Sequence, residues 1–200
     1  MGMSSIIKDA FEAGLADPVY HERLIADIQG AVRQAGIPEA FVWTALPKYC
    51  GKTEVAYVTQ LYEHMNREDP VYGLVYVGKV DGEPINDRMM AIAGACLRNY
   101  INAKVMTLQD VLSAMKNNEM PSPTVLLIPN FFLSKKSGGH IADWEISSLI
   151  SLLYKRQQEQ KQTVLYVGDW DGLGSEYGPV FVEHLSGNKF VKVYKDMIEH

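Results

Sequence analysis

Apolar residues recur at two different spacings along this chain. Over residues 1–35 they return every three or four positions, which predicts amphipathic helices, and a similar pattern predicts a helix over 52–69. From residue 70 onward, short runs rich in β-branched and aromatic residues alternate with further helical patterns. The predicted strands are 70–78, 103–108, 123–132, 162–170 and 189–195, and the predicted helices between them are 86–101, 108–118, 143–160 and 174–187.

The strand patterns predict a parallel sheet. The runs are apolar throughout, which is typical of strands that are buried on both faces under helices. We therefore expect an α/β fold in which helices over residues 1–35 precede a domain with a five-stranded parallel sheet over residues 36–200. In such sheets ligands bind at the carboxyl ends of the strands, so candidate chemistry is sought there.

The composition does not change the predicted fold, but it argues against several classes of function. The chain has 200 residues, 47% of them hydrophobic, and no apolar run reaches the roughly 18 residues that span a bilayer. Two cysteines, Cys50 and Cys96, favour a reduced, cytoplasmic protein, and the histidines have no metal-site spacing, so we expect neither a metal nor a cofactor. The net charge of −5 favours a protein partner over extensive contact with nucleic acid.

The loop after the first predicted strand resembles a phosphate-binding loop that has lost its charges. That loop has the pattern G-x-x-x-x-G-K-[ST], in which the lysine binds phosphate oxygens and the hydroxyl binds Mg²⁺. Here the chain reads "VGKVDGEPIN", with Gly78 as the first glycine. Alignments on Gly82 or Glu83 place Pro84, Ile85 or Asn86 at the lysine and hydroxyl positions, and none of these is a cation.

Two other positions at the expected edge also lack ATPase residues. The strand 123–132 contains Pro129 and Asn130 where acids would hold Mg²⁺, and the strand 162–170 contains Gly168 where a polar sensor would stand. No arginine follows Arg156, so an arginine finger has no candidate in the C-terminal part. These losses predict an ATPase fold without catalytic residues.

A separate Gly-Lys-Thr occurs in "YCGKTEV", at residues 49–55. The first glycine of the motif would stand five residues earlier, where the chain has Leu46. The alternative interpretation is the N-terminus of a helix, close to Lys52 and Thr53.

The order and spacing of these segments resemble the AAA+ domain of bacterial helicase loaders of the DnaC/DnaI type, and of the related IstB-like transposition ATPases. The resemblance covers residues 36 to about 193 and implies a three-layer α/β/α sandwich and a role beside a replicative helicase or a DNA-processing complex. In that family an arginine finger would fall near His184, and a sensor asparagine on Gly168. The matching segments are "GIPEAF", "GLVYVGKVDG", "AKVMTLQDVLSAM", "TVLLIPNFF", "WEISSLISLLYKRQQEQKQTVLYVGDW" and "GPVFVEHLSGNKFVKV".

The resemblance leads to one preferred function, a non-hydrolysing loader or adaptor from a phage or mobile element that contacts a DnaB-type helicase. Loaders of this family use an N-terminal extension for that contact, and here the extension carries an apolar stripe that either docks on the partner or packs on its own domain. The stripe consists of Phe11, Leu15, Tyr20, Leu24 and Ile28. DNA contact would use Lys135, Lys136, Lys155 and Arg156, which as an alternative are solvated surface charges.

Two other functions are left open by the sequence. One is an enzyme that still binds ATP, through a reshaped loop over 78–86 or through Lys52. The other is a structural or inhibitory protein that caps an active AAA+ assembly.

Overall fold

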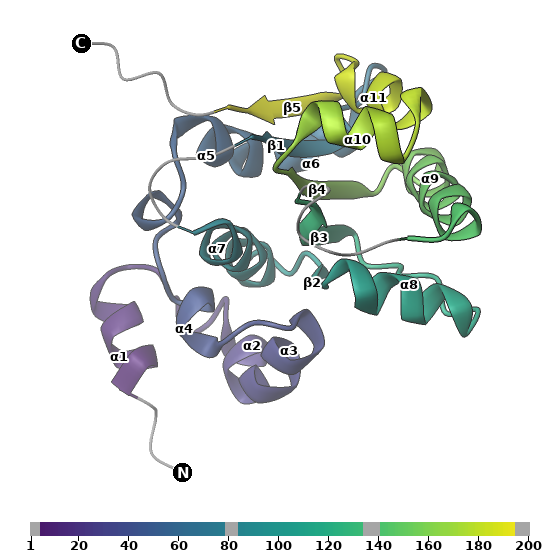
Figure 1. The fold of residues 1–200 in the computed structure, drawn as a ribbon. Helices are drawn as coiled ribbons and strands as arrows, with labels where there is room; N and C mark the ends of the chain where they lie inside the picture. The colour runs from purple at the N-terminus through teal and green to yellow at the C-terminus, as the bar shows by residue number, and fades with distance from the viewer. Residues whose placement is uncertain (1–4, 79–83, 134–140, 195–200) are drawn as a thin grey trace.

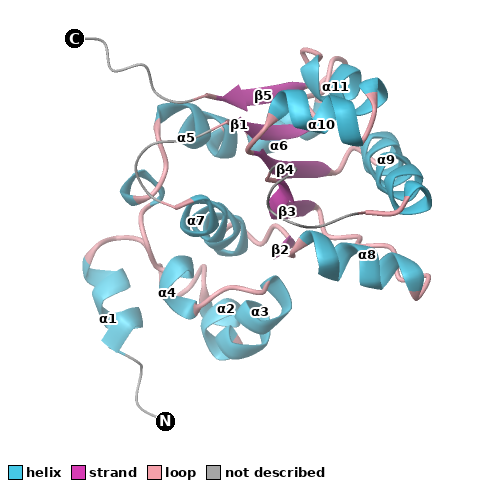
Figure 2. Ribbon diagram, viewed as in Figure 1, coloured by secondary structure: helices cyan, strands magenta, loops and turns pink. Residues whose placement is uncertain are grey.

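A five-stranded sheet forms the centre of the computed structural model, which describes residues 5–78, 84–133 and 141–194 (Figure 1). All neighbouring strands are parallel, in the spatial order β2-β3-β4-β1-β5 (Figure 2). The prediction of a five-stranded parallel α/β sheet is therefore confirmed. The strands are β1 (Gly73–Val77), β2 (Ala103–Val105), β3 (Val125–Phe132), β4 (Gln162–Val167) and β5 (Phe190–Val193).

Helices cover both faces of the sheet. Along β1, Leu74 and Tyr76 are buried on one face against α5 (Lys52–Thr59), α6 (Leu61–Asn66) and α7 (Ile85–Arg98). Val75 is buried on the opposite face against a second layer of helices (Figure 1). That layer consists of α8 (Leu108–Lys116), α9 (Asp143–Gln158), α10 (Trp170–Glu176) and α11 (Pro179–Ser186).

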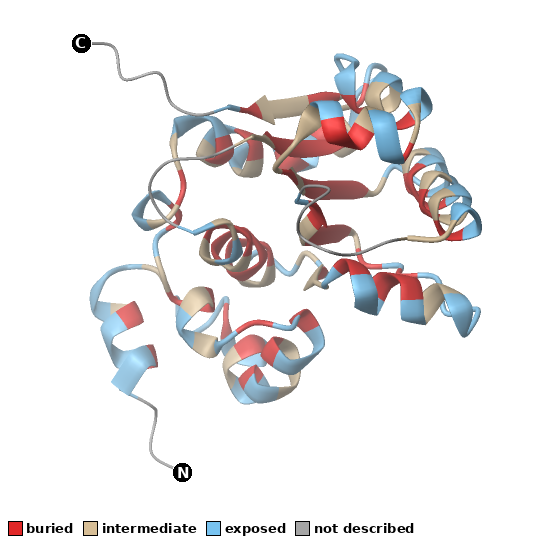
Figure 3. Ribbon diagram, viewed as in Figure 1, coloured by how far each residue is buried: buried red, intermediate tan, exposed pale blue. Residues whose placement is uncertain are grey.

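The N-terminal segment packs on the α7 side of the sheet and shares its core. It forms several short helices because Gly14 has a φ of +67° and the Asp17 carboxylate accepts hydrogen bonds from Val19 N and Tyr20 N, which builds a turn. Apolar residues of this segment belong to the same buried cluster as those of α7. Figure 3 shows buried positions on these short helices and along α7. The elements are α1 (Ser5–Glu12), α2 (Glu22–Ala26), α3 (Ile28–Ala35), α4 (Glu39–Val42) and the 3₁₀ turn η1 (Leu46–Lys48).

The contact between α4 and α7 depends on Gly94. A Cβ atom at this position would lie 2.2 Å from the Phe41 carbonyl oxygen, so no side chain fits between the two backbones. The glycine carries the usual cost in helix propensity, which the close approach of α4 offsets.

Two predicted helices are each divided in the structure. The segment 174–187 contains the end of α10 and then α11, because Gly178 has a φ of +92° and Pro179 starts a new helix. The segment 52–69 is divided into α5 and α6 at Gln60, where the backbone leaves helical geometry. A capping box between Thr107 and Asp110, a motif local in the sequence, is present at the start of α8.

Arg156 is a structural residue, and its prediction as a DNA contact is wrong. Only 2% of it is exposed. Its guanidinium donates hydrogen bonds to the Thr163 hydroxyl (2.9 Å) and to the carbonyl oxygens of Pro123 (3.0 Å) and Gln162 (2.5 Å). Burial lowers the pKa of this arginine to about 10. These bonds join α9 to β4 and to the segment that leads into β3.

We expect Arg156→Met to lower the free energy of unfolding by about 3 kcal/mol, because it leaves several buried carbonyl oxygens without a donor. Urea denaturation followed by circular dichroism measures this loss. The matched control is Lys155→Met on the same helix, whose exposed side chain makes the expected change less than about 0.5 kcal/mol. Equal stability of the two variants would contradict the structural role of Arg156.

Candidate functional site

At the carboxyl edge of the sheet, β1 ends at Val77 and α7 begins at Ile85, so the position expected for a phosphate-binding loop lies between them. Gly78 follows β1 with a φ of +70°, and its N–H donates to the Val167 carbonyl oxygen at the end of β4 (2.8 Å). The chain re-enters a helix at Ile85, with Pro84 at the N-cap in an extended conformation. Two residues of the predicted site, Gly82 and Glu83, lie outside the described residues.

The first turn of α7 offers no cation to a phosphate. Ile85 packs against the apolar core, and Asn86 is exposed. Asp87 brings negative charge to the end of the helix where an anion would bind. This turn therefore lacks the charge that a triphosphate requires.

The nearest arginine on α7 is buried in an internal ion pair. Arg88 Nη1 lies 2.5 Å from Glu54 Oε1 on α5, and both side chains are almost fully buried. Cys50 Sγ lies 3.7 Å from the Arg88 carbonyl oxygen. Burial, followed by the charge of Glu54, raises the pKa of the Cys50 thiol to about 12 and also raises the pKa of the Tyr76 hydroxyl. The cysteine is therefore a protonated, unreactive thiol at neutral pH.

The Gly-Lys-Thr at residues 51–53 is the N-terminus of a helix. Gly51 is the N-cap of α5, and Lys52 and Thr53 are exposed in its first turn. Over residues 5–50 no strand precedes this turn, so it has none of the strand context of a phosphate-binding loop.

Polar side chains at the ends of β3 and β4 bind the starts of helices. Asn130 Oδ1 accepts the Leu108 N–H at the start of α8 (2.8 Å), and Asn130 Nδ2 donates to Gln109 Oε1 (3.0 Å). Asp169 accepts the Gly172 N–H in the first turn of α10 (2.9 Å). Both groups are satisfied within the protein, as buried polar groups generally are.

The two remaining predicted positions at this edge, Pro129 and Gly168, have no polar side chain that could bind a nucleotide. Pro129 lies within β3 and is partly buried. A Cβ atom on Gly168 would lie 2.8 Å from the Leu133 carbonyl oxygen, so there is no room for a sensor side chain without a shift of the backbone.

The predicted partner stripe is mostly turned inward. Leu24 and Ile28 are buried in the core, and Phe11 and Leu15 are partly buried against it. Tyr20 is 54% exposed and contacts the ring of Tyr100. Four of the five residues therefore contribute to the packing of their own domain.

Of the predicted DNA contacts, only Lys155 is exposed in the described part of the chain, since Arg156 is buried and Lys135 and Lys136 lie outside it. Lys155 lines a groove between α8 and α9 together with Trp144, which is 53% exposed. The Lys116 ammonium lies 5.2 Å from the centre of the Trp144 ring, but it also pairs with Glu145. The groove therefore has little net positive charge.

The described residues contain neither a group arranged to hold a metal ion nor a helix that could cross a membrane. Within 5–78, 84–133 and 141–194, no group of three or more His, Cys, Asp or Glu side chains is arranged to hold a metal ion. Over the same ranges, no helix is long and apolar enough to cross a membrane.

The sheet order, with α7 after β1 and helices on both faces, defines the class of fold as a three-layer α/β/α sandwich around a parallel sheet. Solved structures with similar folds include DnaA bound to AMPPCP and single-stranded DNA, with a TM-score of 0.53 and 14% identity over 76% of this chain and 50% of that one. A DNA replication initiation factor (TM-score 0.52, 15% identity) aligns over 74% of this chain and 49% of its own. AMPPCP-bound DnaA from Aquifex aeolicus (TM-score 0.52, 11% identity) aligns over 74% of this chain and 49% of its own.

These similarities concern the fold, and the chain spans about half the length of the structures it matches. No protein-family model matches the sequence, and no curated protein matches it. The similar folds support the α/β/α sandwich that the sequence resemblance implies. The AAA+ helicase-loader family itself stays a prediction.

We expect Asn130→Ala to lower the free energy of unfolding by about 1 kcal/mol, because the first N–H group of α8 loses its acceptor. Thermal or urea denaturation measures the change. Asn130→Asp is the matched control, since it keeps an acceptor oxygen and places negative charge at a helix N-terminus. If the alanine variant were as stable as the wild type, the capping role of Asn130 would be refuted.

Proposed function

We propose that this chain is an adaptor with an AAA+-like fold that acts in DNA replication or in DNA processing by a mobile element, through protein contacts and without hydrolysing nucleotide. One observation carries the proposal. At the described ATPase positions, Asn130 binds the start of α8, Ile85 packs against the core, and Asn86 is exposed and uncharged. An ATP-binding edge needs those positions for counter-charges to the triphosphate.

The connection with replication rests on two kinds of similarity. The fold is similar to that of replication initiators, and the segment order resembles helicase loaders. A DnaB-type helicase is therefore the first partner to test. The third possibility, a protein that caps an AAA+ assembly, also acts through protein contacts and differs in its partner.

Nucleotides are expected to leave the melting temperature unchanged within about 1 °C. A ligand at 100 times its Kd stabilises a protein by about 2.7 kcal/mol, which corresponds to a rise of roughly 5–10 °C for a chain of this size. Differential scanning fluorimetry with 1 mM ATP or ADP and Mg²⁺ tests this. A rise of several degrees that disappears in Lys52→Ala but not in Lys48→Ala would instead establish the ATP-binding alternative.

The full-length chain is expected to co-elute with a DnaB-type helicase in size-exclusion chromatography. Val19 is 85% exposed beside Tyr20 on the N-terminal segment, so Val19→Asp should abolish the complex without affecting the core. Val180→Asp on α11, in the other helical layer, is the matched control and should retain it. Absence of a complex with the wild-type chain would refute the helicase as partner.

A further inference from the structure

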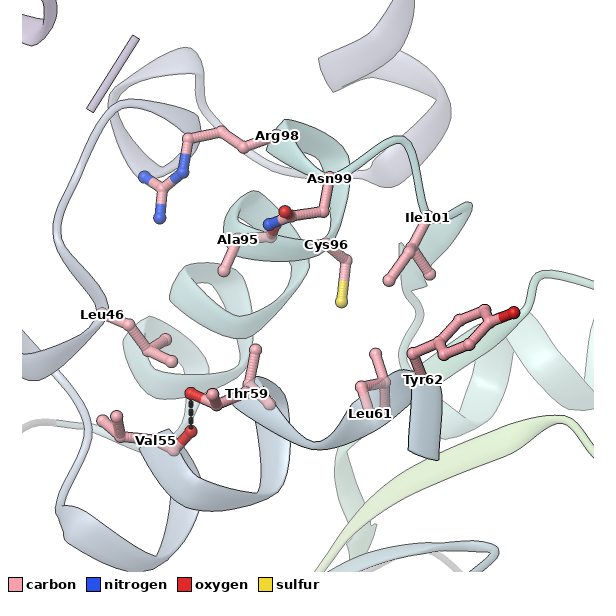
Figure 4. A pocket seen from close by; sticks show the side chains of 11 residues that line it. Leu46, Val55, Thr59, Leu61, Tyr62, Ala95, Cys96, Arg98, Asn99 and Ile101 are labelled. Atoms are coloured by element: carbon pink, nitrogen blue, oxygen red, sulfur yellow. Dashed lines mark hydrogen bonds between the residues drawn. The ribbon is translucent and has the colours of Figure 1, made fainter. Parts of the chain in front are cut away.

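A pocket of about 530 Å³ lies between α5 and α6 on one side and α7 on the other (Figure 4). This volume is within the range of pockets that bind ligands or the anchoring side chains of a partner. Its apolar lining comes from η1, α5, α6, α7 and the connection between α7 and β2, and is provided by Leu46, Val55, Val58, Leu61, Cys96 and Ile101.

The floor of the pocket has little capacity for polar groups. The Thr59 hydroxyl donates to the Val55 carbonyl oxygen of its own helix (2.8 Å), and Asn99 Nδ2 donates to the Ala95 carbonyl oxygen (2.8 Å). Burial raises the pKa of the Cys96 thiol to about 12, so this residue is a small neutral group at physiological pH. An apolar side chain is the group that such a floor binds best.

One end of the pocket carries a positive charge without an acidic partner. Arg98 is half-buried, and Nη1 donates to the carbonyl oxygens of Val42 (2.7 Å) and Thr44 (2.6 Å). Among the described residues no carboxylate forms an ion pair with this guanidinium, and its Nε–H and Nη2 donors have no acceptor there. Because arginine binds carboxylates with several donors at once, these donors are suited to an anion.

The rim of the pocket carries an aromatic side chain that nothing covers. Tyr62 on α6 is 73% exposed, and Figure 4 shows it at the opposite end of the pocket from Arg98. Tyrosine and arginine are the residue types that most often dominate the binding energy at protein interfaces. Tyr62 and Arg98 lie at opposite ends of the pocket, so a polypeptide segment that crosses the pocket could contact both.

We propose that this pocket is a docking site for a partner protein, which inserts a large apolar side chain between α5 and α7 and places a neighbouring Asp or Glu on Arg98. This rests on the proposed adaptor function, and it specifies the chemistry of the segment that binds. The apolar group covers the floor, and the carboxylate supplies the counter-charge that Arg98 lacks.

The test uses the full-length chain and three labelled nine-residue peptides, each with a central Phe-Leu pair. The first has Glu on both sides of the pair, the second has Gln and the third has Lys. Fluorescence anisotropy should give at least a tenfold lower Kd for the Glu peptide than for the Gln peptide, and no saturation with the Lys peptide. In ¹⁵N-labelled protein, the amide signals of Ala95, Asn99 and Ile101 should shift on binding.

Two exposed positions allow the pocket to be changed while the fold is kept. Thr59→Trp should fill the pocket and abolish binding, and Tyr62→Ala should raise the Kd about tenfold, or about 1.4 kcal/mol. Tyr194→Ala, at an exposed tyrosine beyond β5, is the matched control and should bind as the wild type does. Arg98→Gln, checked for folding by circular dichroism, should bind the Glu and Gln peptides equally.

Equal affinity of the wild type for all three peptides, or binding that persists in Thr59→Trp, would overturn the docking site. The same samples are run with the helicase. Peptide failure with an intact helicase complex refutes only the pocket. Peptide binding without a helicase complex supports the pocket and refutes only the helicase as partner.

Discussion

Helices cover both faces of the parallel sheet, and this double burial determines where polar side chains are placed. Strand residues such as Leu74, Val75 and Tyr76 have no access to water, so the sheet interior has no room for exposed polar chemistry. The carboxyl edge is where strands give way to loops and where helices begin with N–H groups that have no partner in the helix. In nucleotide-binding members of this architecture, part of that need is met by phosphate oxygens.

In this protein, side chains of the chain itself accept hydrogen bonds from the N–H groups at the starts of these helices. Asn130 accepts an N–H of α8, Asp169 accepts an N–H of α10, and Thr107 closes a capping box with Asp110. Two arginines are likewise bound within the protein, because Arg88 pairs with Glu54 and Arg156 donates hydrogen bonds to backbone carbonyl oxygens. In the described part of the edge, these polar groups are therefore already satisfied.

Sequence periodicity was sufficient to predict the parallel sheet, because five apolar runs separated by helical patterns are compatible with few other folds. It was also sufficient for the start of α8, where Thr107 and Asp110 form a local motif. It failed where a residue's surroundings come from distant parts of the chain. Arg156 occupies a position on α9 that gives no sign of burial, and its acceptors belong to β4 and to the segment before β3. The pairing of Glu54 with Arg88, 34 residues apart, has no local signal either.

The sequence predicted which ATPase residues the candidate site lacks. It did not predict the hydrogen bonds that the residues at those positions make instead. The missing lysine and acids can be read directly from residues 78–86 and 129–130, whereas the capping role of Asn130 depends on how β3 ends beside α8. The uncompensated charge of Arg98 was equally hidden, since its neighbours come from α4, α5 and α7. Such features depend on tertiary contacts that spacing along the chain does not encode.

The pairing of Glu54 with Arg88 has a consequence for how this sequence can change over time. Replacement of one member alone leaves the other as an unpaired charge in the interior, which lowers the free energy of unfolding. Replacement of both by apolar residues of similar volume leaves no unpaired charge and is tolerated. Homologues are therefore expected to keep both members or to lose both. This correlation gives a way to recognise distant relatives whose overall sequences have diverged beyond ordinary comparison.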